Sequence, residues 1–115
     1  MSKRIYLSGP MTGLPEFNYP LFHRTARRLR EEGHFVFNPA EYPYDGPLED
    51  FPVRTAFADY AEFICLEATA IYLLPGWQRS QGSLAEVALA RVCRLNIVEM
   101  EHEERAEWPE PHFDF

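Results

Sequence analysis

The chain has 115 residues, which is enough for one domain with a single hydrophobic core. Hydrophobic residues make up 46% of it and aromatic residues 15%, which indicates a packed globule and excludes a disordered chain. Of the formal net charge of −7, −6 falls between Glu99 and Phe115, so the rest is nearly neutral and carries no basic stripe for a nucleic acid.

The N-terminal part of the chain predicts a strand, a loop and a helix. Residues 4–8 form a short apolar run, and the prolines and glycines at 9–15 enforce a loop. Asn18 is a suitable N-cap for a helix that has Pro20 in its first turn. Gly33 supplies the residue that ends this helix.

The remaining elements alternate between strand and helix. They are a strand at 34–37, an irregular loop at 38–52, a helix at about 53–67, a strand at 70–74, a helix at 84–94 and a strand at 96–100. This alternation predicts a small doubly wound α/β domain of the flavodoxin or Rossmann-like type, with right-handed crossovers. We expect a parallel sheet of order 2-1-3-4 with helices on both faces, in a domain over 1–100, and an acidic tail over 101–115.

The cysteines, histidines and apolar runs restrict the remaining classes. Cys65 and Cys93 lie inside expected helices without metal-type spacing, so we predict buried free thiols in a reducing cytoplasm. The four histidines lack paired spacing, and we expect no metal and no cofactor. The apolar runs are too short to span a bilayer and the first residues lead into a strand, so we expect a cytoplasmic protein without a membrane contact.

Two loops are expected to meet where the sheet order reverses, because loops at the carboxyl ends of parallel strands share one crevice. The first follows the strand at 4–8 and contains Gly9, Pro10, Met11, Thr12 and Gly13. The second runs from Leu74 to Glu86 and includes Gly82. Neither matches a dinucleotide fingerprint or a phosphate loop, so a tight turn is the alternative for the first.

Glu86 has two interpretations. Ser83-Leu84-Ala85-Glu86 fits the S-x-x-E capping box, in which Glu86 only hydrogen bonds a backbone amide. Alternatively, a carboxylate in the first turn of a helix at the crevice stays ionised through the helix dipole. It would then suit attack on the oxocarbenium-like C1′ of a sugar.

Three further positions are candidate site residues, and each also has a purely structural interpretation. Ser80 and the amides of 81–84 offer an anion site at a helix N-terminus, or an ordinary first turn. Asp59, with Glu62 three residues on, places a second carboxylate near the crevice, or simply solvates a helix face. Trp77 is a lid or base-stacking platform, or a packing anchor.

Several of these segments together resemble one known family. They are 6–13 (Tyr-Leu-Ser-Gly-Pro-Met-Thr-Gly), 38–41 (Asn-Pro-Ala-Glu) and 73–77 (Leu-Leu-Pro-Gly-Trp), followed by Ser80, Gly82 and Glu86. They resemble the bacterial and phage domains of unknown function DUF4406, which look like a branch of the nucleoside 2-deoxyribosyltransferase superfamily. The resemblance extends to about Met100.

The resemblance implies a reaction and roles for three residues. Members of that superfamily break the N-glycosidic bond of 2-deoxynucleosides or of their 5′-monophosphates. The position of their glutamate nucleophile is Glu86 here, and the tyrosine that orients it is Tyr6. The aspartate that handles a proton or the sugar hydroxyl corresponds to Asp59.

The resemblance also implies a substrate class. Base-exchanging transferases carry an aspartate six residues before the glutamate, whereas the 5′-monophosphate N-glycosidases carry a phosphate-binding serine. Ser80 occupies that position, and a neutral hydroxyl suits a phosphate that an aspartate would repel. Thr12 stands where those hydrolases have a phosphate-binding arginine, and Arg79 is the candidate substitute.

Three functions remain as hypotheses. The first is an N-glycosidase or transferase acting on a 2-deoxynucleotide or 2-deoxynucleoside through Glu86. The second is a non-catalytic nucleotide-binding or sensing module that keeps the pocket. The third is a related α/β binding fold of the TIR or lysine-decarboxylase-like type that recognises another ribosyl ligand. We also expect a homodimer, since the aromatic-rich helices offer surface to bury and relatives complete their sites with a neighbouring subunit.

Overall fold

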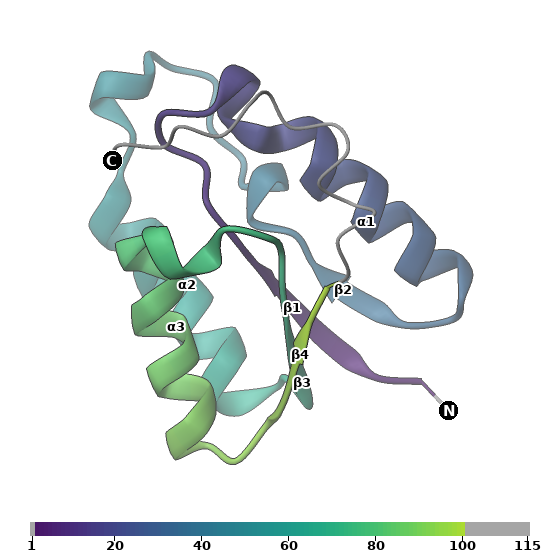
Figure 1. Ribbon diagram of the computed structural model, residues 1–115. Coiled ribbons are helices and arrows are strands. Elements are labelled where there is room, and N and C mark those ends of the chain that lie inside the picture. The colour runs from purple at the N-terminus through teal and green to yellow at the C-terminus, as the bar shows by residue number, and fades with distance from the viewer. Residues whose placement is uncertain (1, 101–115) are drawn as a thin grey trace.

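The computed structural model describes residues 2–100, which form one α/β layer structure around a four-stranded parallel sheet of order β2-β1-β3-β4 (Figure 1). The strands are β1 (Arg4–Ser8), β2 (Phe35–Phe37), β3 (Ala70–Leu73) and β4 (Asn96–Glu99), and the helices are α1 (Tyr19–Glu31), α2 (Val53–Leu66) and α3 (Gln81–Val92). The predicted fold class and strand order are confirmed. The predicted acidic tail at 101–115 lies outside the described residues.

The pleat of β1 divides its side chains between two cores. Helix α1 lies on one side of the sheet, and α2 and α3 lie on the other (Figure 1). Ile5 and Leu7 pack with residues of α1, whereas Tyr6 packs with residues of α2 and α3. Because side chains alternate along a strand, Ser8 shares the face of Tyr6. The C-terminal part of β1 therefore places the hydroxyl groups of Tyr6 and Ser8 on the side of the sheet that α3 covers.

The start of α1 differs in detail from the prediction. Asn18 occupies the N-cap position, but its backbone is left-handed (φ 63°) and its side chain does not cap the helix. Instead its Nδ2 donates a hydrogen bond of 3.0 Å to the carbonyl oxygen of Pro10. The buried Asn18 thus holds the first glycine loop in place. Gly33 ends the helix region with φ 99°, as predicted.

The start of α3 overturns the capping-box interpretation. The helix begins at Gln81, three residues earlier than expected, and Ser80 is its N-cap. The Oγ of Ser80 accepts a 3.1 Å hydrogen bond from the Ser83 amide. Ser83 therefore lies inside the helix, and the side chain of Glu86 is left free for contacts outside the backbone of α3.

The buried face of α2 does not include Cys65, which was expected to be buried. Its buried residues are Ala56, Phe63 and Ile64, and Cys65 is exposed. Each helical residue turns by about 100°, so the position after an inward Ile64 moves toward solvent. Cys65 and the partly exposed Cys93 are free thiols, but the prediction that they are buried is wrong.

The loop at 38–52 is anchored to α1 and contains two short 3₁₀ helices, Pro39–Glu41 and Leu48–Asp50. Arg30 donates to both carboxylate oxygens of Glu41 at 2.8 and 2.9 Å, and this pairing lowers the pKa of Glu41. The aromatic rings of Tyr42 and Phe51 pack with centroids 5.8 Å apart. The loop is thereby folded back beside the first turn of α2.

No helix within residues 2–100 is long and apolar enough to cross a bilayer. The longest of the three α-helices, α2, has 14 residues, whereas a span needs about 20.

One buried hydroxyl in the core beneath α1 leads to a stability prediction. Thr25 is 1% exposed, and its Oγ1 has no hydrogen-bond partner among the described residues. Thr25→Val keeps the shape and removes the unpaired hydroxyl, so we expect the free energy of unfolding to rise by about 1 kcal/mol in urea titrations. The matched control Thr69→Val removes a hydroxyl that accepts from the Arg4 amide and should lower it. A loss of stability in Thr25→Val would show that the hydroxyl is paired in solution.

Candidate active site

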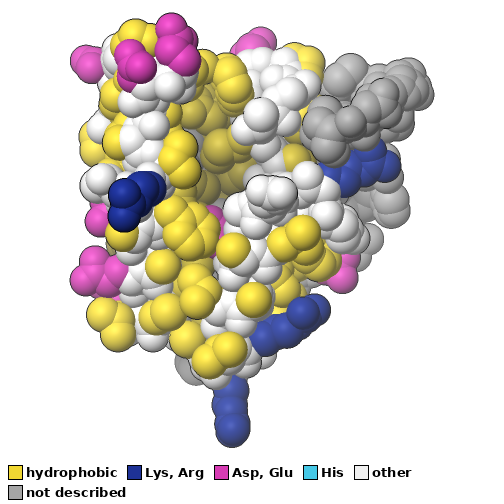
Figure 2. Space-filling view, turned by 90° about the vertical axis from the view of Figure 1, so that its left-hand side faces the viewer, with side chains coloured by type: hydrophobic (Ala, Val, Ile, Leu, Met, Phe, Trp, Pro, Cys, Tyr) yellow, Lys and Arg dark blue, Asp and Glu magenta, His cyan; other side chains and the backbone are white. Residues whose placement is uncertain are grey.

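A cavity of about 550 Å³ opens beside the ends of β1 and α3, and both glycine loops border it. Seen from the side of α2 and α3, the surface is hollowed and hydrophobic side chains form much of the wall (Figure 2). Nine of the predicted site residues line the cavity: Tyr6, Gly9, Pro10, Met11, Thr12, Ser80, Gly82, Ser83 and Glu86. The expected meeting of the two loops is therefore present.

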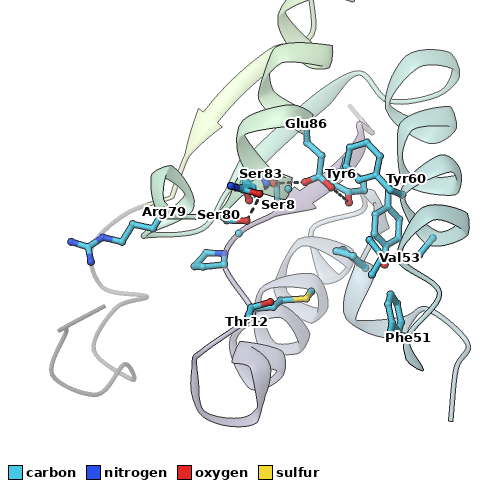
Figure 3. Close-up of a pocket in the computed structure, with 18 residues that line it drawn as sticks. Tyr6, Ser8, Thr12, Phe51, Val53, Tyr60, Arg79, Ser80, Ser83 and Glu86 are labelled. Atoms are coloured by element: carbon cyan, nitrogen blue, oxygen red, sulfur yellow. Dashed lines mark hydrogen bonds between the residues drawn. The ribbon is translucent and has the colours of Figure 1, made fainter. Parts of the chain in front are cut away.

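Glu86 lies at the floor of this cavity and is only 6% exposed. The Tyr6 hydroxyl donates to its Oε2 at 2.8 Å, and the Ser8 hydroxyl donates to its Oε1 at 2.6 Å (Figure 3). Each carboxylate oxygen thus has its own donor from β1. The carboxylate is fixed across the gap between strand and helix, which a capping role would not require.

Burial dominates the ionisation of Glu86. It raises the pKa of this carboxyl to about 7, although the hydrogen bonds from Ser8 and Tyr6 act in the opposite direction. Burial of the carboxyl therefore opposes the ionised state that the dipole of α3 was expected to favour. Burial, and then the charge of Glu86, raises the pKa of Tyr6, so its phenol stays a hydrogen-bond donor.

One wall of the cavity is polar and belongs to the first turn of α3. Ser80, Gln81, Gly82 and Ser83 line it, and the amides of a helix N-terminus attract negative charge. The Oγ atoms of Ser83 and Ser8 lie 2.8 Å apart (Figure 3). Serine hydroxyl groups therefore line this wall from Ser80, the N-cap of α3, to the carboxylate of Glu86.

The opposite wall is apolar and comes from the loop at 38–52 and from α2 (Figure 3). Phe51, Val53, Phe57 and Tyr60 line it, and Val53 is 65% exposed at the mouth. The rings of Tyr60 and Tyr6 have centroids 6.0 Å apart. The cavity is thus amphipathic, with hydroxyls on one side and aromatic rings on the other.

The family described as a domain of unknown function, DUF4406, matches residues 3–99 of the chain. The chain belongs to the DUF4406 family. The family that the sequence motifs indicated is confirmed. No curated protein matches this chain.

Three predicted site residues of this DUF4406 domain lie away from the cavity lining. Asp59 is exposed on α2, where its carboxylate accepts a 3.0 Å hydrogen bond from the Tyr42 hydroxyl. Trp77 packs at the edge of the core and donates to Glu99 at 3.3 Å, which favours its interpretation as a packing anchor. Gly13 makes a turn with φ 89° beyond the lining.

The sequence interpretation missed Ser8 and the apolar wall of the DUF4406 site. The signal for Ser8 was its position two residues after Tyr6, which places both on one face of β1. The signal for the wall was the spacing of Val53, Phe57 and Tyr60, which places them along one face of α2 near its N-terminus.

Gly9 is needed for the close approach of the first loop to the end of β3. A Cβ at this position would lie 2.8 Å from the Cβ of Leu74, which is closer than side chains tolerate. Thr12 lines the cavity, as does Arg79, whose side chain extends away from the Glu86 carboxylate (Figure 3). Within residues 2–100, no group of three or more His, Cys, Asp or Glu residues is arranged to hold a metal ion.

Proposed function

We propose that this DUF4406 protein cleaves the N-glycosidic bond of 2-deoxynucleoside 5′-monophosphates, with Glu86 as the nucleophile. The observation that carries the proposal is the buried Glu86 carboxylate, held by two hydroxyls at the floor of an open cavity. A carboxyl whose pKa is shifted by burial inside a cleft is a candidate for catalysis. The likeness of the motifs to the 2-deoxyribosyltransferase superfamily supports the same residue.

In the proposed reaction, one oxygen of ionised Glu86 attacks C1′ of the sugar. The C1′–N bond breaks, the base leaves with the bonding electrons, and it takes up a proton. Asp59 is exposed, and its carboxylate accepts a hydrogen bond from Tyr42 away from the cavity lining. Solvent in the open cavity is therefore the proposed source of this proton. Water then hydrolyses the 2-deoxyribosyl ester, which releases 2-deoxyribose 5-phosphate and restores Glu86.

The two walls suit the two ends of a nucleotide. The cavity of about 550 Å³ lies within the range of small-molecule sites. The rings of Phe51, Phe57 and Tyr60 offer an apolar surface for a base, and the first turn of α3 offers amides and hydroxyls for a phosphate. A sugar between these ends would lie beside Glu86.

The proposal is tested by incubating the protein with a panel of 2-deoxynucleosides, ribonucleosides and their 5′-monophosphates, followed by chromatography for the free base. We expect base release from 2-deoxynucleotides, because a sugar without a 2-hydroxyl reaches the oxocarbenium state more readily. Binding of a nucleotide without base release would favour the non-catalytic nucleotide-binding module. Release from ribonucleotides at an equal rate would contradict the substrate class.

We predict a preference of about tenfold for deoxyguanosine 5′-monophosphate over deoxyguanosine. A charge-assisted hydrogen bond contributes roughly 1.5–3 kcal/mol, and Thr12 in place of an arginine puts the preference at the lower end. Calorimetric titration in a Glu86→Gln background measures binding without turnover.

Two substitutions of the N-cap residue provide matched variants for this titration. Asp and Asn both cap helices well, so Ser80→Asp and Ser80→Asn should fold alike. Only Ser80→Asp adds a negative charge, and we expect it to abolish the preference while Ser80→Asn retains part of it. Equal affinities of the parent protein for both ligands would contradict the phosphate assignment.

The homodimer and the cytoplasmic location stay predictions. Leu84 and Val92 are exposed apolar residues on the outer side of α3, and a second copy of the chain would cover them in the proposed dimer.

A further inference from the structure

We propose that Ser8 and Ser83 are positioning residues for Glu86. Their two hydroxyl groups form a hydrogen-bonded chain that orients one carboxylate oxygen of Glu86 and stabilises its ionised form. This inference rests on the proposed role of Glu86 as the nucleophile. Ser8 is 1% exposed and lies between two partners, with 2.6 Å to Glu86 Oε1 and 2.8 Å to Ser83 Oγ. The three groups therefore form one continuous buried path from α3 to β1 and back to α3.

The direction of the hydrogen bonds follows from the number of hydrogens. A serine hydroxyl has one hydrogen and two acceptor lone pairs. With Glu86 ionised, Ser8 gives its hydrogen to Oε1, and Ser83 gives its own hydrogen to the Oγ of Ser8. Both serines are then satisfied, and the chain ends in a short, charge-assisted bond to the carboxylate.

The same chain can run in the opposite direction when Glu86 is protonated. The carboxyl then carries its proton on Oε1 and donates to Ser8, and Ser8 donates to Ser83. Tyr6 continues to donate to Oε2 in both states. The buried carboxyl thus has hydrogen-bond partners in both protonation states, and the strong charge-assisted bond is made only in the ionised state.

Few other titratable groups face Glu86. Tyr6 comes from β1 and Tyr60 from α2, and burial raises the pKa of both phenols. Arg79 lines the same cavity before α3, with its side chain directed away (Figure 3). Because the two phenols stay neutral near pH 7, the hydroxyl donors are the main groups in the described site that favour the ionised carboxylate.

The test measures the pKa of Glu86 in the full chain by carbon NMR of its side-chain carboxyl, assigned by comparison with Glu86→Gln. We expect Ser8→Ala to raise this pKa by about one to two units, because it removes a charge-assisted hydrogen bond. Ser83→Ala removes only the second bond of the chain and should raise it by a few tenths of a unit. Ser8→Cys restores a weak donor and should give an intermediate value.

The control is Thr25→Val, which removes a buried hydroxyl under the opposite face of the sheet and should leave the pKa of Glu86 unchanged. With a deoxynucleotide substrate, Ser8→Ala should reduce kcat about tenfold at pH 6 and recover most of it near pH 9. A merely structural role would lower kcat equally at all pH values. An unchanged pKa in both Ser8→Ala and Ser83→Ala would overturn the inference.

Failure of the proposed function gives a different result. In that case no substrate is cleaved by the parent protein, while the NMR titration still decides whether the two serines control the ionisation of Glu86. If Ser8→Ala does not fold, Ser83→Ala and Ser8→Cys decide, since a pKa equal to that of the parent in both contradicts the chain.

Discussion

Glu86→Gln is expected to reduce base release from a 2-deoxynucleotide on the order of 10³-fold or more. Glutamine has nearly the same shape and can accept from Tyr6, so the fold and the cavity should remain. It has no ionised oxygen to attack C1′, and the covalent route is lost. Single-turnover assays of the parent and the variant, with chromatography of the free base, measure the difference directly.

Two observations complete this test. Glu31→Gln makes the same substitution at an exposed position of α1 and should leave the rate within about twofold, because it touches no part of the cavity. Mass spectrometry of the acid-quenched parent protein should detect a 2-deoxyribosyl adduct on Glu86. If Glu86→Gln cleaves within a few fold of the parent, the nucleophile is another group.

The same substitution is expected to change how stability depends on pH. The pKa of Glu86 is about 7 in the folded protein and near 4.5 in the unfolded chain. Between these values the folded state binds more protons than the unfolded state, so the free energy of unfolding falls as pH rises. The stabilising contribution is complete below about pH 4.5 and is lost as pH rises through about 7.

The expected size of this effect is about 2–3 kcal/mol between pH 5 and pH 8. Urea unfolding of the parent and of Glu86→Gln across this range isolates the contribution of Glu86, because all other titrating groups are common to both proteins. Glu41, whose pKa is lowered by Arg30, acts in the opposite direction in both and cancels. The variant should gain stability relative to the parent as pH rises, and a constant difference would mean that Glu86 titrates like an exposed carboxyl.

Local sequence patterns did not decide between the two interpretations of Glu86. Ser83 and Glu86 have the spacing of a capping box, and nothing local distinguishes Ser83 from Ser80 as the N-cap. The helix begins at Gln81 because the preceding residues form a 3₁₀ turn, Trp77–Arg79, that leaves Ser80 extended and ready to accept from the Ser83 amide. Glu86 then faces β1 instead of the start of its own helix.

The apolar wall of the cavity was also predicted only in part. The spacing of residues on α2 predicted an amphipathic helix, and the helix is present with nearly the predicted bounds. The sequence could not tell that Phe57 and Tyr60, in the first two turns of this helix, border a cavity. Asp59, two residues from Phe57, consequently faces Tyr42 on the outside.

By itself the sequence determined the order of the elements, the parallel sheet, the reversal of strand order and the family, because these depend on local periodicity, turn residues and motif spacing. Only the tertiary structure decided which hydroxyls reach Glu86 and how its charge is controlled. The donors Tyr6 and Ser8 lie 80 and 78 residues away along the chain and become neighbours only when α3 packs on β1. The burial that raises the pKa of Glu86 is likewise a property of that packing, which no local pattern contains.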